Sequence, residues 1–405
     1  MKPALLVLAV LLTACGSPGE PGPPLTANLS GVVTTASDAV LAGASVTVGS
    51  AVATTGADGR FELQNLPVGP AAVLVSAPDF NSTFVVVTLT EGTNTRDIAL
   101  HPVDRGVWGT RANLLKNNSE YALAEANGRI YVLGGYPPEM GPNRTSSTVQ
   151  VYDIASDSWT LGPDLPQPNN HGMAAAVNGR IYLIGGQTTD DQQGATAVAT
   201  VYELDPSAGA WVEKAAMPTA RSGGVAVAHG GRIYVAGGRV PRGHDFAVYD
   251  PATNEWTELP SLPSQRNHIT GAAIDGRIHI VGGRLGNGLS PLKSDAHEVF
   301  NPQTLTWTTA APMLRGRSGM NGVVARGCFH VWGGEAPTGM TPDHDYYNPR
   351  TDKWWSLSNM PIPIHGVVGS AFVDGLVWVT GGGTGVGGAS GSLHNQTYTP
   401  DVSCE

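Results

Sequence analysis

Apolar and polar residues alternate in short runs along most of this chain, a pattern typical of strands rather than helices. The region from Leu25 to about His101 contains runs such as GVVTTA, ASVTVG and RFELQNL, separated by turn residues that include Asp58-Gly59, a strong signal for a two-residue hairpin turn. Beyond the N-terminus, no window keeps apolar residues at the 3.6-residue spacing of an amphipathic helix. We therefore predict an all-β protein whose first domain, a small β-sandwich, spans residues 25–101.

From residue 102 onward the pattern becomes a repeat. The stretch NGRIYVLGG at residues 127–135 returns as NGRIYLIGG at 178–186 and, more loosely, in four further copies, with the second glycine of each pair at positions 135, 186, 238, 283, 334 and 382. Each copy has an apolar run, a turn, a second apolar run ending in Gly-Gly, a variable loop and an aromatic residue, usually followed by tryptophan. A period near fifty residues is typical of propeller blades, so residues 102–405 are predicted to form a six-bladed β-propeller.

Both regions resemble known families. The repeats resemble the kelch family through the Gly-Gly pairs and through an aromatic residue seven positions before tryptophan, as in Tyr152/Trp159, Tyr249/Trp256, Phe300/Trp307 and Tyr347/Trp354. Residues 25–101 resemble the carboxypeptidase regulatory-like domains, which are transthyretin-like β-sandwiches, through Gly31, Gly43-Ala44, Asp58-Gly59-Arg60-Phe61 and Leu66-Pro67-Val68-Gly69. This region has no cluster of His, Cys or carboxylate residues. We therefore expect a spacer or docking module rather than a catalytic domain.

The sixth repeat is incomplete, since no tryptophan follows Tyr398 at the usual spacing. We predict that residues 106–115, which include Trp108, pair with residues 393–399 and close the ring, which removes its open edges. Antiparallel strand order places Cys328 and Cys404 on the same face of adjacent blades, so a disulfide between them is also predicted. The alternative is two unpaired cysteines.

The N-terminus has the pattern of a targeting segment. Met1-Lys2 gives a positive start, and residues 4–12 are almost wholly apolar but too few to span a bilayer. The segment then ends in Leu-Thr-Ala before Cys15, which resembles a bacterial lipoprotein signal. The resemblance implies removal of residues 1–14, a lipid on Cys15, a Pro/Gly tether over residues 15–24 and, since no aspartate follows the cysteine, the outer membrane. An ordinary signal peptide with an incidental cysteine is the alternative.

Composition and motifs exclude several functions. The 33 acidic and 23 basic residues give a net charge of -10 without a basic cluster, which disfavours a nucleic-acid partner. The sequence has no GxSxG, CxxC or HExxH motif. Residues 383–388 have the letters of a dinucleotide-binding turn, but no helix-forming run follows them. We expect a monomer without a cofactor.

The candidate site lies where the first strand of each blade begins, because these positions gather around the axis of a propeller. Aligned on the Gly-Gly pairs, with one- or two-residue insertions allowed, the residues that open these strands are Glu120, His171, Ser222, His268, Ser318 and His365. The polar residues just before them are Asn170, Arg221, Arg266, Asn267 and Arg317. We predict a ligand-binding ring at this pore mouth, in which arginines pair with carboxylates and histidines with hydroxyl groups.

Two other interpretations of the ring stay open. In the first, the polar residues serve only the backbone groups of the loops. A metal site formed by His171, His268 and His365 is less favoured, because three imidazoles would have to converge to roughly 2 Å from one ion.

The predicted function is recognition: an envelope-anchored module that binds a protein or a glycan. The alternative is an enzyme, since a sialic-acid mutarotase and a group of copper oxidases are built on the kelch propeller that this chain resembles. The oxidases need a cysteine crosslinked to a tyrosine near the axis, and Cys328, the one cysteine within the blades, starts a second strand away from it. A purely structural envelope protein is a third alternative.

Overall fold

The computed structural model describes residues 25–36, 38–137, 145–191, 194–388 and 390–405, and these residues form strands and turns. The chain divides into two compact units, and the boundary along the chain falls between Val103 and Asp104. The all-β class predicted from the alternating pattern is confirmed. Within the described ranges, no helix of the length and hydrophobicity needed to cross a membrane occurs.

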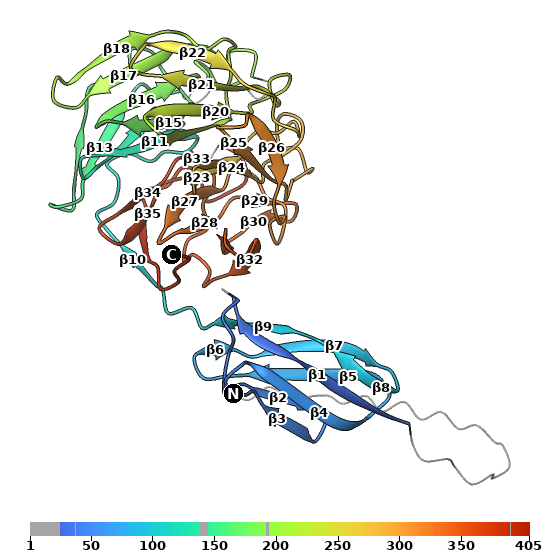
Figure 1. Ribbon diagram of the computed structural model, residues 1–405. Helices are drawn as coiled ribbons and strands as arrows, with labels where there is room; N and C mark the ends of the chain where they lie inside the picture. The colour runs from blue at the N-terminus through green and yellow to red at the C-terminus, as the bar shows by residue number, and fades with distance from the viewer. Residues whose placement is uncertain (1–24, 37, 138–144, 192–193, 389) are drawn as a thin grey trace. The chain divides into compact units, whose positions relative to one another are not determined.

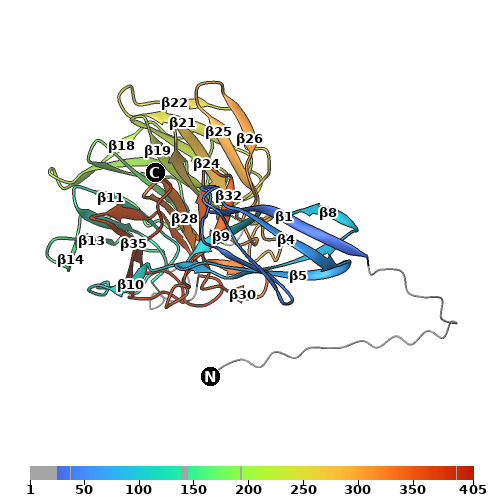
Figure 2. The same ribbon diagram turned by 60° about the horizontal axis from the view of Figure 1, so that its bottom comes forward.

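The first unit is a β-sandwich of two sheets, ordered β4-β1-β9-β6 and β3-β2-β5-β7, with β8 parallel to β1 (Figure 2). Its strands are β1 (Thr26–Thr35), β2 (Ser45–Val48), β3 (Ala51–Thr54), β4 (Arg60–Pro67), β5 (Gly69–Ser76), β6 (Phe80–Asn81), β7 (Thr83–Leu89), β8 (Gly92–Thr95) and β9 (Ile98–Pro102). Alternate residues such as Leu29, Val46 and Phe61 fill the core between the sheets. The Asp58-Gly59 turn does not close a hairpin, because it connects β3 to β4 in the opposite sheet.

The second unit is a ring of six antiparallel blades whose first strands lie nearest the axis (Figure 1). Blade 1 contains β11 (Tyr121–Ala126), β12 (Arg129–Leu133), β13 (Val149–Asp153) and β14 (Ser158–Leu161). Blade 2 contains β15 (Met173–Val177), β16 (Arg180–Ile184), β17 (Val201–Asp205) and β18 (Ala210–Lys214). Blade 3 contains β19 (Val225–His229), β20 (Arg232–Ala236), β21 (Phe246–Asp250) and β22 (Glu255–Glu258).

Blades 4 to 6 follow the same order. Blade 4 contains β23 (Thr270–Ile274), β24 (Arg277–Val281), β25 (His297–Asn301) and β26 (Thr306–Thr309). Blade 5 contains β27 (Asn321–Ala325), β28 (Cys328–Trp332), β31 (His344–Asn348) and β32 (Lys353–Ser356). Blade 6 contains β34 (Ala371–Val373), β35 (Leu376–Thr380), β36 (Asn395–Thr399) and β10 (Val107–Thr110). Blade 5 also carries the short hairpin of β29 (Glu335–Ala336) and β30 (Gly339–Met340), and β33 (Val367–Val368) runs parallel to β11. The predicted six-bladed propeller is thereby confirmed.

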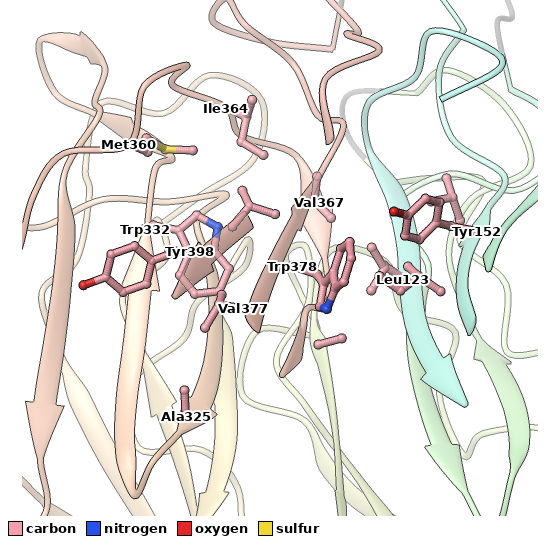
Figure 3. Close-up of a cluster of buried hydrophobic side chains, with 14 of the residues drawn as sticks. Leu123, Tyr152, Ala325, Trp332, Met360, Ile364, Val367, Val377, Trp378 and Tyr398 are labelled. Carbon is pink, nitrogen blue, oxygen red and sulfur yellow. The ribbon is translucent and has the colours of Figure 1, made fainter. Parts of the chain in front are cut away.

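Aromatic side chains fill the wedges between neighbouring blades. Tyr152 packs against Trp159 of its own blade, with ring centroids 5.0 Å apart, and against Trp378 of blade 6 at 5.3 Å (Figure 3). Each repeat tryptophan also donates its indole N–H to a backbone carbonyl that follows the fourth strand of the preceding blade. The bond from Trp256 to Ala215 is 2.8 Å long. The repeated spacing of aromatic and tryptophan is thus explained by blade-to-blade packing.

The closure of the ring agrees with the prediction. β10 pairs antiparallel with β36, so that Trp108 lies opposite Tyr398, and hydrogen bonds from Arg111 and Leu114 extend the contact beyond the strand. The indole of Trp159 donates to the carbonyl of Ala112, which follows β10 as Ala215 follows β18. β10 therefore takes the place of the fourth strand of blade 6.

The predicted disulfide is present between Cys328 and Cys404, whose Cα atoms lie 5.1 Å apart. Cys328 begins β28 in blade 5, and Cys404 lies beyond β36 of blade 6. The amide N–H of Cys404 also donates to the carbonyl of Arg326 at 2.9 Å. The bond therefore fastens the end of the chain to a neighbouring blade.

We expect replacement of both cysteines by serine to lower the free energy of unfolding by about 3 kcal/mol, because the unfolded chain gains freedom when the cross-link is lost. Urea unfolding of the oxidised protein and of the Cys328→Ser/Cys404→Ser variant measures the difference. A reductant should destabilise the parent and leave the variant unchanged. Equal stabilities of oxidised parent and variant would contradict the prediction.

Candidate axial site

The backbone forms a series of hydrogen bonds from blade to blade at the end of the axis where the first strands begin. The N–H of His171 donates to the carbonyl of Glu120 at 2.8 Å, and Gly223 donates to His171 at 2.9 Å. The full series runs through Glu120, His171, Gly223, His268, Gly319 and Gly366. One residue of each blade therefore lies at the axis, as the prediction of a ring requires.

These six residues share a left-handed backbone conformation. In blades 3, 5 and 6 the position is glycine, for which a positive φ carries no steric cost. In blades 1, 2 and 4 it is Glu120, His171 and His268, with φ of 52°, 49° and 52°. Residues with a side chain are strained in this conformation, and such strain is typical of functional positions. Three side chains in a conformation that suits glycine mark these residues as candidates for a specific role.

The structure corrects the alignment made from the sequence in three blades. Ser222, Ser318 and His365 lie one residue before the axial glycines of blades 3, 5 and 6. They are therefore equivalent to Asn170 and Asn267 rather than to the axial histidines. The error arose because the alignment allowed for insertions, whereas the axial residue lies 15 positions before the second glycine of the pair in blades 1 to 5 and 16 positions before it in blade 6.

Two histidines are oriented in the same way by the asparagine that precedes each of them. Nδ1 of His171 lies 2.6 Å from Oδ1 of Asn170, and Nδ1 of His268 lies 2.6 Å from Oδ1 of Asn267. Both asparagine amide nitrogens donate to backbone carbonyls, so Oδ1 is left to accept the Nδ1–H of the ring. Nε2 of each neutral histidine is thereby an acceptor directed at the axis.

A second ring of residues surrounds these histidines, and sequence reasoning missed it. The residue directly after each Gly-Gly pair lies beside the axial positions: Tyr136, Gln187, Arg239, Arg284, Glu335 and Gly383. Arg239 donates to Nε2 of His171 and Arg284 to Nε2 of His268, both at 2.9 Å. The signal was present in the sequence, because the position follows the most regular feature of the repeat.

Hydrogen bonds and ion pairs join the two rings into one group, which we call the axial cluster. It comprises Glu120, His171, Arg239, His268, Arg284, Lys293, Glu335 and His365. Oε2 of Glu335 accepts from Arg284 at 3.0 Å and from Lys293 at 3.2 Å. Nε2 of His365 lies 3.4 Å from Glu120 and 3.6 Å from Glu335. Both carboxylates are therefore surrounded by donors and cations.

The protonation states follow from burial and from these neighbours. Burial opposes ionisation of Glu120, but His365 and Arg284 outweigh it and hold the pKa of this carboxyl well below its usual range. Burial, together with Arg239 and Arg284, lowers the pKa of His171 to about 3, and the pKa of His268 is also strongly lowered. Burial works against a charge on His365 too, yet Glu120 and Glu335 raise its pKa. The cluster thus holds neutral and charged histidines side by side.

The three predicted arginines do not join this cluster. Arg221, Arg266 and Arg317 are fully buried, and each guanidinium donates to backbone carbonyls of its own blade. Arg266 also pairs with Glu298, and Arg317 with Asp345 at 2.7 Å. These side chains stabilise the blades, in agreement with the alternative in which polar residues of the ring serve only backbone groups.

The cluster is poorly suited to a metal ion. One ligand atom each from Glu120, His171 and His268 lie within 4.8 Å of one another, whereas His365 contacts the two glutamates instead. However, the Nε2 atoms that would bind the ion already accept hydrogen bonds from Arg239 and Arg284. Two guanidinium groups supply positive charge at the place where a metal would need to sit, and they oppose a further cation.

The axial cluster closes one end of the central channel. The channel has a volume of ≈ 320 Å³ and is lined by the first strands, mostly with small apolar residues such as Ala175, Val227 and Ala273. Every member of the cluster has its side chain or whole residue at least nine-tenths buried. The exposed surface at this end belongs to the loops that cover the cluster.

The structure also bears on the enzyme alternatives. The sulfur of Cys328 is bonded to Cys404 and is not free to crosslink with a tyrosine as in the copper oxidases. Residues 383–388 lie in the loop between β35 and β36, so no helix follows them to hold a pyrophosphate.

Comparison with known proteins agrees with this architecture. Residues 120–315 match the KLHDC2/KLHL20/DRC7 kelch-repeats domain, and residues 28–101 match the carboxypeptidase regulatory-like domain. The kelch-like protein terF of Aspergillus terreus is 32% identical over 324 residues, which cover 73% of this chain and 69% of that protein. Alpha-scruin of Limulus polyphemus is 27% identical over 70% of this chain, but only 26% of its own length is covered.

The solved structure of YjhT has the same fold. The two chains share a TM-score of 0.59 at 16% sequence identity, over 70% of this chain and 95% of YjhT. The repeats, the six closed blades and the similarity to terF agree, and the chain belongs to the kelch-repeat family, with a carboxypeptidase regulatory-like domain before its propeller.

Proposed function

We propose that this chain is a lipid-anchored envelope protein, held at the outer membrane through Cys15, whose propeller binds a protein partner with the loops that cover the axial cluster. Kelch propellers generally mediate protein interactions, which supports the choice of partner class. The signal-like segment and the tether, residues 1–24, lie outside the described residues, so the anchor rests on the sequence pattern alone.

The observation that carries the proposal is a group of exposed aliphatic side chains on these loops. The axial patch, as we call it, comprises Val240, Leu285, Leu289, Leu292 and Val386. Leu289 is 59% and Leu292 61% exposed, although both are large apolar residues. Grouped apolar side chains on a surface mark interaction sites, because water solvates them poorly.

Hydrogen bonds and packing hold the loops of three blades together under this patch. The side chain of Asn287 in blade 4 bonds to both the N–H and the carbonyl of Val240 in blade 3. Gly387 of blade 6 donates its N–H to Glu335 of the axial cluster, and a Cβ on it would lie 3.5 Å from Leu289. The buried charges thereby position the loops, and a rigid patch loses little entropy when it binds.

The chemistry of the patch favours a protein over a glycan. A glycan site needs polar groups that reach the ligand, and the polar ring predicted at the pore mouth lies buried beneath the loops. The aliphatic residues of the patch instead fit apolar anchor residues of a partner, which would fill the spaces between them.

Photo-crosslinking in the source cells tests the proposal. We expect a photo-reactive amino acid in place of Leu289 or Leu292 to give a discrete protein adduct, which mass spectrometry of the purified adduct identifies. Leu161 is 56% exposed on the outer strand of blade 1 and is the matched control. Purified partner should then bind the parent and fail to bind Leu289→Asp/Leu292→Asp. Adducts equal to those at Leu161, or unchanged binding of the aspartate variant, would rule the patch out.

A further inference from the structure

The sandwich domain presents an uncharged sheet whose outer face is apolar. None of the residues in β2, β3, β5 and β7 carries a charge. The register places Val52, Thr47, Leu74 and Phe84 directly opposite one another in a row across all four strands. Val52 is 61%, Leu74 42% and Phe84 65% exposed, so the row faces solvent, and Val86 on the same face is 67% exposed. A solvated sheet face normally carries polar residues at these positions.

The strand β7 lies at one edge of this sheet, next to β5 (Figure 1). Its seven residues, TFVVVTL, pair with β5 in an unbroken register from Leu89 to Thr83. Among the described residues, β5 is the strand to which β7 is bonded. Protein edge strands usually carry a lysine, a proline or a bulge that prevents pairing with another chain, and β7 has none of these.

We propose that β7 is the interface of a homodimer, in which two copies of the sandwich domain join edge to edge in antiparallel orientation. Every copy carries the same uncharged edge, so a twofold axis brings two complementary strands together without repulsion. The register that pairs all seven residues places Val86 opposite Val86 of the second copy and Phe84 opposite Thr88. Across the seam, Ala72 and Val86 of one copy then lie in line with Val86 and Ala72 of the other.

A membrane surface fits this edge less well than a strand does. Lipid would cover Phe84 and Val86, but it offers no hydrogen bonds to the open N–H and C=O groups of β7. A second strand satisfies both the apolar face and the backbone. This inference departs from the monomer expected from the sequence, and it is independent of the partner proposed for the axial patch.

Sedimentation velocity of the chain from residue 25 onward tests the proposal. We expect the mass to rise from that of one chain to that of two between micromolar and hundreds of micromolar concentration. Val86→Asp and Val86→Lys should each weaken association at least tenfold, since each places two like charges opposite one another at the twofold axis. An equimolar mixture of the two variants should restore the dimer, because aspartate then faces lysine.

Two control variants sharpen the test. Leu161→Asp changes an exposed leucine of the propeller and should leave association unchanged. Val52 lies on the same sheet face but in β3, at the edge opposite β7. Val52→Asp should therefore weaken edge pairing far less than Val86→Asp does. A chain that stays monomeric at every concentration, or a mixture of charged variants that fails to associate, would overturn the proposal. Equal effects of the Val52 and Val86 substitutions would overturn edge pairing in favour of face-to-face contact.

Discussion

We expect the protein to lose stability steeply as the pH falls below about 6.5, because six buried histidines are held neutral in the folded state. Burial lowers the pKa of His171, His279 and His330 to about 3 and that of His297 to about 4. It also lowers the pKa of His268 and His344 strongly. In the unfolded chain these rings take up protons near pH 6.5. In the folded chain His171, His279, His330 and His297 do so only near pH 3 to 4, and the pKa values of His268 and His344 lie well below 6.5.

The sign and size of the effect follow from this difference. The stability contributed by a group with a lowered pKa is present above pH 6.5 and is lost as the pH falls toward the folded pKa. Each histidine contributes up to about 1.4 kcal/mol per pH unit, and six contribute up to about 8 kcal/mol per pH unit. A domain of ordinary stability, about 10 kcal/mol, would therefore unfold near pH 5. His365 has a raised pKa and acts in the opposite direction, losing stability as the pH rises, but it is a single group.

Urea unfolding between pH 7.5 and pH 5 measures this dependence. The pair His279 and His297, whose Nδ1 and Nε2 atoms lie 2.8 Å apart, supplies the test variant. Replacing both by glutamine should reduce the pH slope by about a third, whatever the variant's absolute stability. The control His244→Gln changes an exposed histidine and should keep the parent's slope. A free energy of unfolding that stays constant from pH 7 to pH 5 would show that these rings are not held neutral.

The architecture was predictable because the sequence repeats the same structural signals in six copies. The Gly-Gly pairs, the hairpin turns and the spaced tryptophans recur in each blade, so the fold follows from period alone. The closing strand around Trp108 was predictable because the last repeat lacks the tryptophan that should follow Tyr398. The disulfide followed from strand order, since antiparallel neighbours place Cys328 and Cys404 at the same end of their blades.

The site was less predictable, because it depends on distances between blades that a single repeat does not contain. The arginines at 221, 266 and 317 were expected at the pore, but their long side chains turn back to carbonyls of their own blades. The residues that do reach the axial histidines, Arg239 and Arg284, come from a different point of the repeat. Side-chain direction, rather than position along the strand, decides which residues meet.

We expect the propeller to depend on the segment before its first blade. A chain that begins at Asp104 keeps β10, whereas one that begins at Ser119 lacks it and leaves β36 with an open edge. Asp104 itself accepts a hydrogen bond from the hydroxyl of Tyr398 at 2.8 Å and another from the N–H of Ser358. Trp108 packs on Tyr398 with ring centroids 5.1 Å apart, so its loss also opens the core.

The shorter chain should therefore melt at least 15 °C below the longer one or fail to fold, because it loses a strand, an aromatic wedge and the link to blade 1. Differential scanning calorimetry of the two chains makes the comparison, and the chain from Asp104 controls for removal of the sandwich domain. In the full-length protein, Trp108→Ala should lower the free energy of unfolding by about 3 kcal/mol. Equal melting temperatures for the two shortened chains would mean that five complete blades and a three-stranded sixth already hold the ring. The bond from Trp159 to Ala112 argues against this, because it ties the segment to the first blade while β10 ties it to the last.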